Sequence, residues 1–322
     1  MPANSTFTEI VTSTLRNHPA EIADNVSEHN ALYRRLKKQK KVTLQGGYEI
    51  VRPLDIAENP NYQRYSMYDT LAIGAGDVIS AAKYDWVNAA VHVAAAGEEM
   101  RKNNGPQEIF NLVKARINNA KRTAANNMSI DLYSSGALTN QMGGLGLIIQ
   151  NAGTGTVGGI ISGTYTQWMN QFYEIPSSNA WSKANIKGYM NILWLRQVRG
   201  GDRPDLIVSS HDFYSAYWES LQDLQRYTNG ASGDSAGAGF PELKYVTADV
   251  IFDDNTNFAT TAEKMYFLNT DYLELVFHED AQWTVGDEKS SLNQDAVVVP
   301  IISMHQLVCS NRALQGVLID AA

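Results

Sequence analysis

The segment from residue 42 to residue 76 most constrains how this 322-residue chain can fold. Strand-forming residues run from 42 to 51, Pro53 begins a turn-forming tip that ends at residue 61, and strand-forming residues return over 62–73. Two strands of about 11 residues at about 3.3 Å each would project roughly 35 Å. A lone hairpin of that length is marginally stable in water, so the sequence predicts that it lies on another surface.

A long helix is the second constraint. Residues 78–96 predict a strand whose Ala-rich end turns helical, and Pro106 then supplies a residue type favoured at the first helical position. The apolar spacing that follows predicts an amphipathic helix over 106–133, about 40 Å long at about 1.5 Å per residue. Such a helix can serve as the spine of a domain. Its apolar stripe consists of Phe110, Val113, Ile117, Ala120, Ala124 and Met128.

The rest of the chain mixes helices and strands, and this mixture predicts an α+β fold. Ser182 is expected to cap a helix that ends before Gly200, and a second helix is expected over 212–227. Small residues over 230–239 predict a flexible loop. Period-two and apolar runs predict strands. These strands are expected at 205–209, 243–252, 264–269, 272–285 and 296–309.

The composition, with 44% hydrophobic and 19% charged residues, is that of a globular protein. No apolar run reaches the roughly 18 residues that a membrane-spanning helix needs, and the first residues are polar, without the apolar core of a signal peptide. The single Cys309 cannot form an internal disulfide and is expected to be a buried small hydrophobe. An intracellular location is therefore expected.

Charge is unevenly distributed along the sequence. Seven basic residues against four acidic ones give residues 1–41 a charge of +3, so the net charge of −8 leaves −11 on the rest. An acidic body argues against tight sequence-independent DNA binding. The basic run at 34–41 fits a nucleic-acid patch, and it fits equally a solvated helix end or a contact with acidic neighbouring subunits.

Two glycine motifs resemble catalytic or nucleotide-binding signatures but lack their structural context. Residues 153–158 match G-x-G-x-x-G, yet the β-branched, Gly-broken residues that follow do not form the helix that would meet a pyrophosphate. Residues 233–237 match G-x-S-x-G, yet they lie inside the loop at 230–239 instead of between a strand and a helix. Both are interpreted as structural loops.

Titratable residues do not form a recognisable site in the sequence. His278-Glu279-Asp280 is interpreted as a sheet edge because neighbours on a strand point to opposite faces. Asp253-Asp254 lacks the further acid that a calcium loop needs. No catalytic, cofactor-binding or metal-binding residue is predicted, and the chain is not expected to be an enzyme. No zinc-ligand spacing occurs among His18, His29, His92, His211, His278 and His305.

The order of these elements resembles that of the major capsid proteins of tailed bacteriophages, which share the Hong Kong 97 capsid fold. A short sequence motif adds to the resemblance: the Gly-rich residues 155–159 are followed by Trp168-Met169-Asn170. The resemblance covers nearly the whole chain. It implies an N-terminal arm at 1–41, an extended β-hairpin loop at 42–76, a peripheral domain at 77–136 with spine helix 106–133, an axial domain at 137–259, and strands at 260–322 that return to the peripheral domain.

The resemblance implies a structural function. Copies of the chain would form hexamers and pentamers that close an icosahedral shell around packaged double-stranded DNA without specific binding. The implied location is the virion, after synthesis in the host cytoplasm, with no membrane partner. A portal and a decoration protein are further implied partners. The arm at 1–41 is too short to resemble a fused scaffolding segment, so either a separate scaffolding protein exists or such a segment was removed.

One departure from the family is informative. Some members cross-link neighbours through isopeptide bonds between a loop lysine and an asparagine, but residues 42–82 contain no lysine. We therefore expect the shell to be held by non-covalent contacts. Two alternatives stay open at this point: an encapsulin-like nanocompartment shell, which shares the fold and would load a protein cargo, and an α+β enzyme, which would need clustered titratable residues in a pocket.

Overall fold

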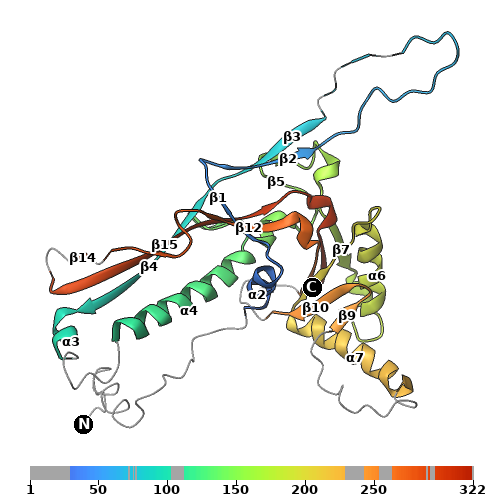
Figure 1. Cartoon of the computed structure of the whole chain (residues 1–322). Coiled ribbons are helices and arrows are strands. Elements are labelled where there is room, and N and C mark those ends of the chain that lie inside the picture. Colours follow the sequence, from blue (N-terminus) through green and yellow to red (C-terminus); the bar gives the residue numbers. More distant parts are fainter. Residues whose placement is uncertain are drawn as a thin grey trace. The chain divides into compact units, whose positions relative to one another are not determined.

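The computed structural model describes residues 30–320 (Figure 1) except 72, 75, 77, 103–111, 229–242, 254–262, 288 and 291–293. The chain divides into two compact units, which are described separately. One contains residues 89–127 and 281–303. The other contains residues 30–88, 128–280 and 304–320. Within the described residues, no helix is both long and apolar enough to cross a membrane.

The smaller unit combines strands with one long helix. Strand β15 pairs with β4, β13 and β14. Val93, Ala120, Val299 and Ile301 form its buried core. The guanidinium of Arg116 joins two segments of this unit, because it contacts the Glu99 carboxylate at 2.9 Å and donates to the Ala94 carbonyl at 2.7 Å. The elements are β4 (Val87–Ala96), α3 (Gly97–Lys102), α4 (Leu112–Leu132), β13 (Thr284–Val285), β14 (Lys289–Ser290) and β15 (Ala296–Cys309), of which β4, α4 and β15 contribute residues to both units.

A six-stranded sheet with two packed helices forms the main core of the larger unit. Helix α6 packs on β7 and β16, and α7 packs on β10. All four residues of β8 are buried, and the first three are apolar. In sheet order the strands are β7 (Gln171–Ile175), β16 (Gly316–Asp320), β11 (Lys264–Leu268), β8 (Leu206–Ser209), β10 (Ala248–Phe252) and β9 (Leu243–Tyr245), and the helices are α6 (Ile186–Gln197) and α7 (His211–Thr228).

Shorter elements complete the larger unit. Strand β1 pairs in parallel with β12, and β12 pairs antiparallel with the last residues of β15. Two antiparallel ribbons, β2 with β3 and β5 with β6, lie outside these sheets. The bounds are α2 (Ala31–Lys38), β1 (Val42–Gln45), β2 (Ile50–Asp55), β3 (Ile79–Tyr84), α5 (Leu145–Ile148), β5 (Thr156–Val157), β6 (Ile160–Ile161), η1 (Thr166–Trp168), η2 (Ser177–Asn179), η4 (Thr270–Tyr272), β12 (Leu273–His278) and η5 (Arg312–Leu314).

Most elements agree with the sequence predictions, and the α+β fold class is confirmed. Ala120, Ala124 and Met128 are buried on α4, as the apolar stripe predicts. The expected helix start at Pro106 lies outside the described residues, as does the loop at 230–239. The boundaries predicted for the arm, loop and domains concern the assembled shell and stay predictions.

Three local predictions were wrong. Pro53 does not end a strand: it lies in β2 opposite Ala81, and the returning strand is β3 instead of 62–73. Proline is tolerated there because both strands of a two-stranded ribbon are edge strands. The Ala-rich end at residue 96 stays in strand β4, since ladder pairing with β15 outweighs helix propensity.

The third concerns the start of α6. Asn185, not Ser182, occupies the position before this helix, which begins at Ile186. The Ser182 hydroxyl donates to Asn185 Oδ1 at 3.1 Å. The Asn185 amide in turn donates to the Ala180 carbonyl at 2.8 Å, so these side chains fix the entry to the helix without capping it.

Candidate subunit interface

The β2–β3 ribbon is firmly attached at its base. Ile50 and Ala82 are fully buried, and the Tyr84 hydroxyl donates to the Cys309 carbonyl at 2.8 Å. Arg52 binds the Glu274 carboxylate of β12 at 2.8 Å. The Lys83 amide donates to the Gly158 carbonyl at 3.0 Å, so the ribbon also contacts the β5–β6 hairpin. These contacts hold the base of the ribbon against the body of its unit.

Beyond this base the chain leaves the body of its unit. Figure 1 shows that the segment after β2 extends away from the other labelled elements of this unit before it returns through β3. The ribbon ends where the Ile56 amide donates to the Val78 carbonyl at 2.9 Å. Inside the segment the Ser66 amide donates to Asp69 Oδ2 at 2.7 Å, and the Asn61 side-chain amide donates to the Gly74 carbonyl, but no strand pairing is formed among the described residues 57–78. The described part of this segment therefore has little internal structure to stabilise it.

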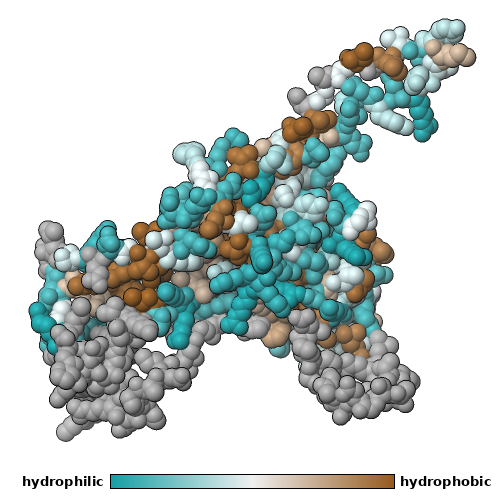
Figure 2. Space-filling view, viewed as in Figure 1, coloured by the Kyte–Doolittle hydropathy of each residue, from teal (hydrophilic) through white to brown (hydrophobic). Residues whose placement is uncertain are grey.

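This segment carries large apolar side chains that face solvent. Tyr62 is 82% exposed, Tyr68 is 97% exposed and Ile73 is 96% exposed. Figure 2 shows hydrophobic residues spread along it among hydrophilic ones. So many large apolar side chains held out in solvent on one segment mark a site of association. We therefore identify the described residues of the range 57–78 as the candidate subunit interface and call them the projecting loop.

The projecting loop has no lysine that could form an isopeptide bond with a neighbouring subunit. Lys83 is the first lysine after Lys41, and its Nζ binds the Glu49 carboxylate at 3.2 Å at the base of the ribbon. The projecting loop itself has Arg64 as its cation, whose guanidinium cannot form an isopeptide bond. Non-covalent contact between subunits therefore stays a prediction, based on the absence of lysine from residues 42–82.

The glycine motif at 153–158 forms a tight structural turn. Strands β5 and β6 pair through Val157 and Ile160, and the two residues between them have positive φ angles of 61° and 76°. Positive φ at both central positions defines a type I′ hairpin, which glycine adopts without steric cost. The indole of Trp168 donates to the Val157 carbonyl at 3.1 Å. The Gly-rich sequence therefore serves chain geometry, in keeping with its interpretation as a structural loop.

A buried arginine that sequence reasoning did not single out holds this region together. Arg312 is fully buried and donates to the Thr154 carbonyl at 3.0 Å and to Asn170 Oδ1 at 2.9 Å. It also donates to the carbonyls of Ile148 and Trp168. Burial lowers the pKa of Arg312 to about 10, so it remains cationic at neutral pH. Its only signal in the sequence is a lone arginine between apolar strands.

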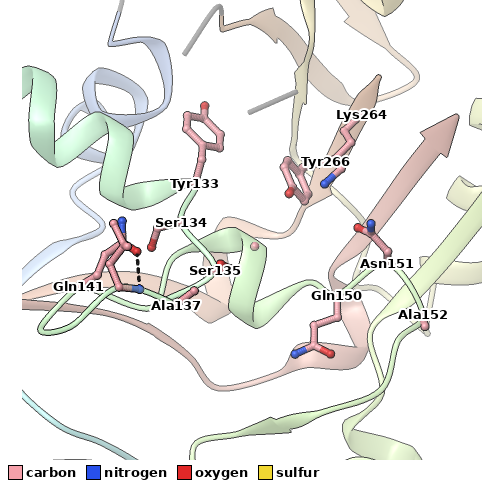
Figure 3. A pocket seen from close by; sticks show the side chains of 12 residues that line it. Tyr133, Ser134, Ser135, Ala137, Gln141, Gln150, Asn151, Ala152, Lys264 and Tyr266 are labelled. Carbon is pink, nitrogen blue, oxygen red and sulfur yellow. Dashed lines mark hydrogen bonds between the residues drawn. The ribbon is translucent and has the colours of Figure 1, made fainter. Parts of the chain in front are cut away.

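A separate hollow of about 630 Å³ lies in the larger unit (Figure 3). Tyr133, Lys264, Tyr266 and Asn151 line one part of it, and Gln141 lies on the opposite side. The Leu138 amide donates to Gln141 Oε1 at 3.4 Å, which is the contact drawn in Figure 3. Its lining contains no histidine, cysteine or carboxylate among the described residues.

Two hydroxyl groups of this hollow are engaged in structure. Tyr133 donates its hydroxyl proton to the buried Asp253 carboxylate at 2.8 Å, and burial together with Asp253 raises its pKa well above the usual value. Ser134 donates to the Met142 carbonyl. Burial lowers the pKa of Lys264. The Ser134 hydroxyl is thus bonded to a backbone carbonyl and not to a base, as the hydroxyl of an activated hydrolase nucleophile would be.

The other residues considered from the sequence lie apart from one another. His278 ends β12 and packs edge-on against Trp86, with ring centroids 5.2 Å apart, and its Nδ1 accepts from the Asp280 amide at 3.2 Å. Cys309 is buried, as expected. Asp254 and the motif at 233–237 lie outside the described residues. Across the described ranges, no three histidine, cysteine or acidic residues gather as metal ligands would.

Comparison with known proteins establishes the fold. No protein-family model matches the sequence, and no curated protein matches it. Solved structures do match. The capsid asymmetric unit of cyanophage A-1(L) superposes with a TM-score of 0.66 at 16% identity, over 92% of this chain and 96% of that chain. The capsid of the native GTA particle gives 0.64 at 13% identity, over 94% of this chain and 92% of that chain.

An encapsulin is similar as well. The holo-SrpI encapsulin complex from Synechococcus elongatus gives a TM-score of 0.58 at 9% identity, over 98% of this chain and 95% of that chain. At such identities the likeness concerns the fold alone. The chain has the Hong Kong 97 capsid fold, and the prediction made from the order of its elements is confirmed.

Proposed function

We propose that this chain is the major capsid subunit of a tailed bacteriophage. Copies associate as hexamers and pentamers, which close an icosahedral shell around packaged double-stranded DNA in the virion. The shell is held by non-covalent contacts. A separate scaffolding protein, a portal and a decoration protein are the further partners of this proposal, and the subunit is made in the host cytoplasm.

The projecting loop is the observation that carries the proposal. A monomer would leave Tyr62, Tyr68 and Ile73 in water, at a cost of about 25 cal/mol for each Å² of apolar surface. A second copy that lies beneath the loop removes this surface from water. Symmetry then repeats the contact around the shell, so that many modest interfaces add to a stable assembly.

The likeness to capsids over more than nine tenths of this chain is the second support. The acidic body is the third. Outside residues 1–41 the chain carries a charge of −11, which disfavours tight phosphate clamps over most of its surface. A container that must release its genome gains from weak, screened contact with DNA.

Electron microscopy of the purified protein tests the assembly. Closed shells of uniform size are expected, and nuclease-protected DNA should be recovered from shells purified from infected or lysogenic cells. A protein that stays monomeric at all concentrations and in all assembly conditions would refute the proposal.

An encapsulin-type compartment is the second candidate, because an encapsulin matches the fold over nearly the whole chain. It would enclose a protein cargo instead of DNA. Mass spectrometry of purified shells distinguishes the two functions: a stoichiometric cargo enzyme with no protected DNA would establish the compartment. An α+β enzyme is not favoured, since Tyr133 and Ser134 of the hollow donate their hydroxyl protons to structural acceptors, the Asp253 carboxylate and the Met142 carbonyl.

A further inference from the structure

Helix α2 presents a face made only of cations. Among residues 30–41, the positions exposed to solvent are Arg34, Lys37, Lys38 and Lys40. The first three have the i, i+3, i+4 spacing that places side chains on one side of a helix. Figure 2 shows a predominantly hydrophilic surface where Figure 1 draws α2. In the part of the chain that the structure describes, none of these four side chains forms an ion pair or a hydrogen bond.

The opposite side of α2 is fixed to the body of its unit. Leu32 and Leu36 are fully buried. Arg35 pairs with Asp249, and Gln39 donates to Asp205 Oδ2 at 3.3 Å. Polar residues on this side therefore have partners within the chain. The four exposed cations are held out to solvent by an anchored helix.

Lys41 extends the anchored side past the end of the helix. Its Nζ binds Asp271 Oδ1 at 2.8 Å. The basic run at 34–41 thus divides into two groups: Arg35 and Lys41 neutralise acids of the same chain, while the four exposed cations face outward. A basic run that served only to stabilise the fold would place its charges on such acids.

Lys40 adds an independent observation. The Lys40 amide donates to the Lys37 carbonyl at 3.2 Å, and the Lys41 amide donates to the Leu36 carbonyl at 2.9 Å. These two bonds form a Schellman motif, in which the residue after the helix is left-handed and is usually glycine. Lys40 occupies that position at a φ of 58°. The Cβ of any residue other than glycine disfavours this left-handed conformation. Lys40 therefore destabilises the fold slightly at a position where it presents an exposed charge.

We infer that these four cations form a contact site for the phosphate backbone of double-stranded DNA. The rest of the chain is acidic and repels phosphate, so the attraction concentrates at this face. Lysine serves as a point charge toward phosphates and is depleted from the cores of protein interfaces. The exposed row contains no apolar or aromatic anchor of the kind that dominates binding between proteins.

The inference rests on the proposed function for the source of the DNA, and it deepens that proposal by naming where the genome touches the subunit. Four phosphate contacts make a weak, salt-sensitive and sequence-independent site. Each contact contributes about 0.9 to the slope of log K against log salt, so the full site contributes about 3 to 4. Salt screens such contacts, so they hold the genome only weakly.

The test uses full-length, dissociated subunits and a short labelled DNA duplex, with fluorescence anisotropy measured across a salt series. In one variant all four exposed cations are changed to glutamine (R34Q, K37Q, K38Q and K40Q). The salt slope should fall by about 3 to 4 and the affinity at moderate salt by at least about tenfold. A control variant neutralises four exposed cations elsewhere (K121Q, K183Q, R199Q and R203Q). It should change the affinity less than about twofold.

Variants of Lys40 separate an effect on DNA affinity from an effect on stability. Lys40→Gly and Lys40→Gln should weaken DNA binding equally, because each removes one charge. Only Lys40→Gly should raise the denaturation midpoint, because glycine adopts the left-handed conformation freely. Equal DNA affinity in the wild type and in both variants would overturn the role given to Lys40.

Other outcomes separate the competing explanations. If polyglutamate binds the same face as tightly as DNA, or if the patch variant binds DNA normally but forms no shells, the face contacts acidic protein and the inference is wrong. Electron microscopy of the wild type without DNA tests shell formation by itself. Failure of the proposed function is therefore distinguishable from failure of this site.

Discussion

Arg312 and Asn170 are joined by a hydrogen bond of 2.9 Å between the guanidinium Nη2 and the Asn170 Oδ1 atom, inside the protein. The Asn170 amide group donates to the Gln150 carbonyl at 2.8 Å, and its Oδ1 also accepts from the Gln150 amide at 3.1 Å. Two side chains thus hold the segment between α5 and β7, which contains the β5–β6 hairpin and η1. The acceptors of Arg312 are backbone carbonyl oxygens and one side-chain amide oxygen, so neutral groups solvate its charge.

Replacing Arg312 with methionine should lower the free energy of unfolding by about 3 kcal/mol, because several buried carbonyl groups lose their donor. Arg312→Lys should recover little of this loss, since an ammonium cannot reproduce the planar fork. Denaturant unfolding of the subunit measures both. The exposed Arg203 provides the control, and Arg203→Met should change stability by less than about 0.5 kcal/mol. An Arg312→Met variant as stable as this control would contradict the assigned role.

Gly158 and Gly159 form a matched pair in one turn. Both have positive φ angles, but a Cβ on Gly158 would lie 2.7 Å from Ala82 Cβ, while a Cβ on Gly159 would meet nothing within 4 Å. Gly158→Ala should therefore destabilise the protein by about 1 to 3 kcal/mol more than Gly159→Ala. Thermal or denaturant unfolding compares the two variants. Equal losses would mean that backbone strain alone determines the preference for glycine.

Stability should depend on His305 at acidic pH. Burial lowers the pKa of His305 from 6.5 to about 4. Because the unfolded chain has the higher pKa, it binds the proton first as the pH falls. The stabilisation is present above about pH 6.5 and is lost progressively toward about pH 4, by roughly 3 kcal/mol in total.

The measurement is the free energy of unfolding across that range of pH. His305→Leu should flatten the dependence, whereas the exposed His211→Leu should keep the slope of the wild type. A wild-type slope in the His305 variant would assign the acid sensitivity to carboxylates instead.

The projecting loop should govern assembly without affecting the fold of the subunit. Replacing Tyr62, Met67 and Tyr68 with serine should leave the free energy of unfolding within about 0.5 kcal/mol, because these side chains are exposed in the monomer. Electron microscopy should show few or no shells. A deletion of 48–68, by contrast, would also remove Ile50 and Arg52 at the base of the ribbon, so the substitutions test the interface more cleanly.

Polar positions of the same loop supply the control. Glu58→Ser, Gln63→Ser and Arg64→Ser should still form shells. Denaturing gels of wild-type shells should show monomers only, since residues 42–82 contain no lysine. Normal shells from the apolar triple variant, or a ladder of cross-linked species, would argue against the interface as described.

Local patterns predicted most of the elements. The buried stripe through Ala120 and Met128 follows from helical spacing, and the structural loop predicted at 153–158 ends in a glycine whose positive φ angle other residues adopt less freely. Strand ends and pairing partners were predicted less well. The position of Pro53 in a strand depended on which chain segment, 62–73 or β3, arrived to pair with it. The β-propensity of single residues does not determine which segment pairs with β2, because the paired residues are distant in sequence.

The sequence by itself determined the class of fold, most of the strands and helices, the absence of lysine from the extended segment and the uneven charge, since these depend on residue types and their spacing. Tertiary structure alone decided which groups meet. It joined Arg312 to Asn170, buried Asp253 against Tyr133, and turned Arg35 and Lys41 toward acids while leaving four neighbouring cations in solvent. Such contacts join segments up to 230 residues apart, so their geometry exists only once the chain has folded.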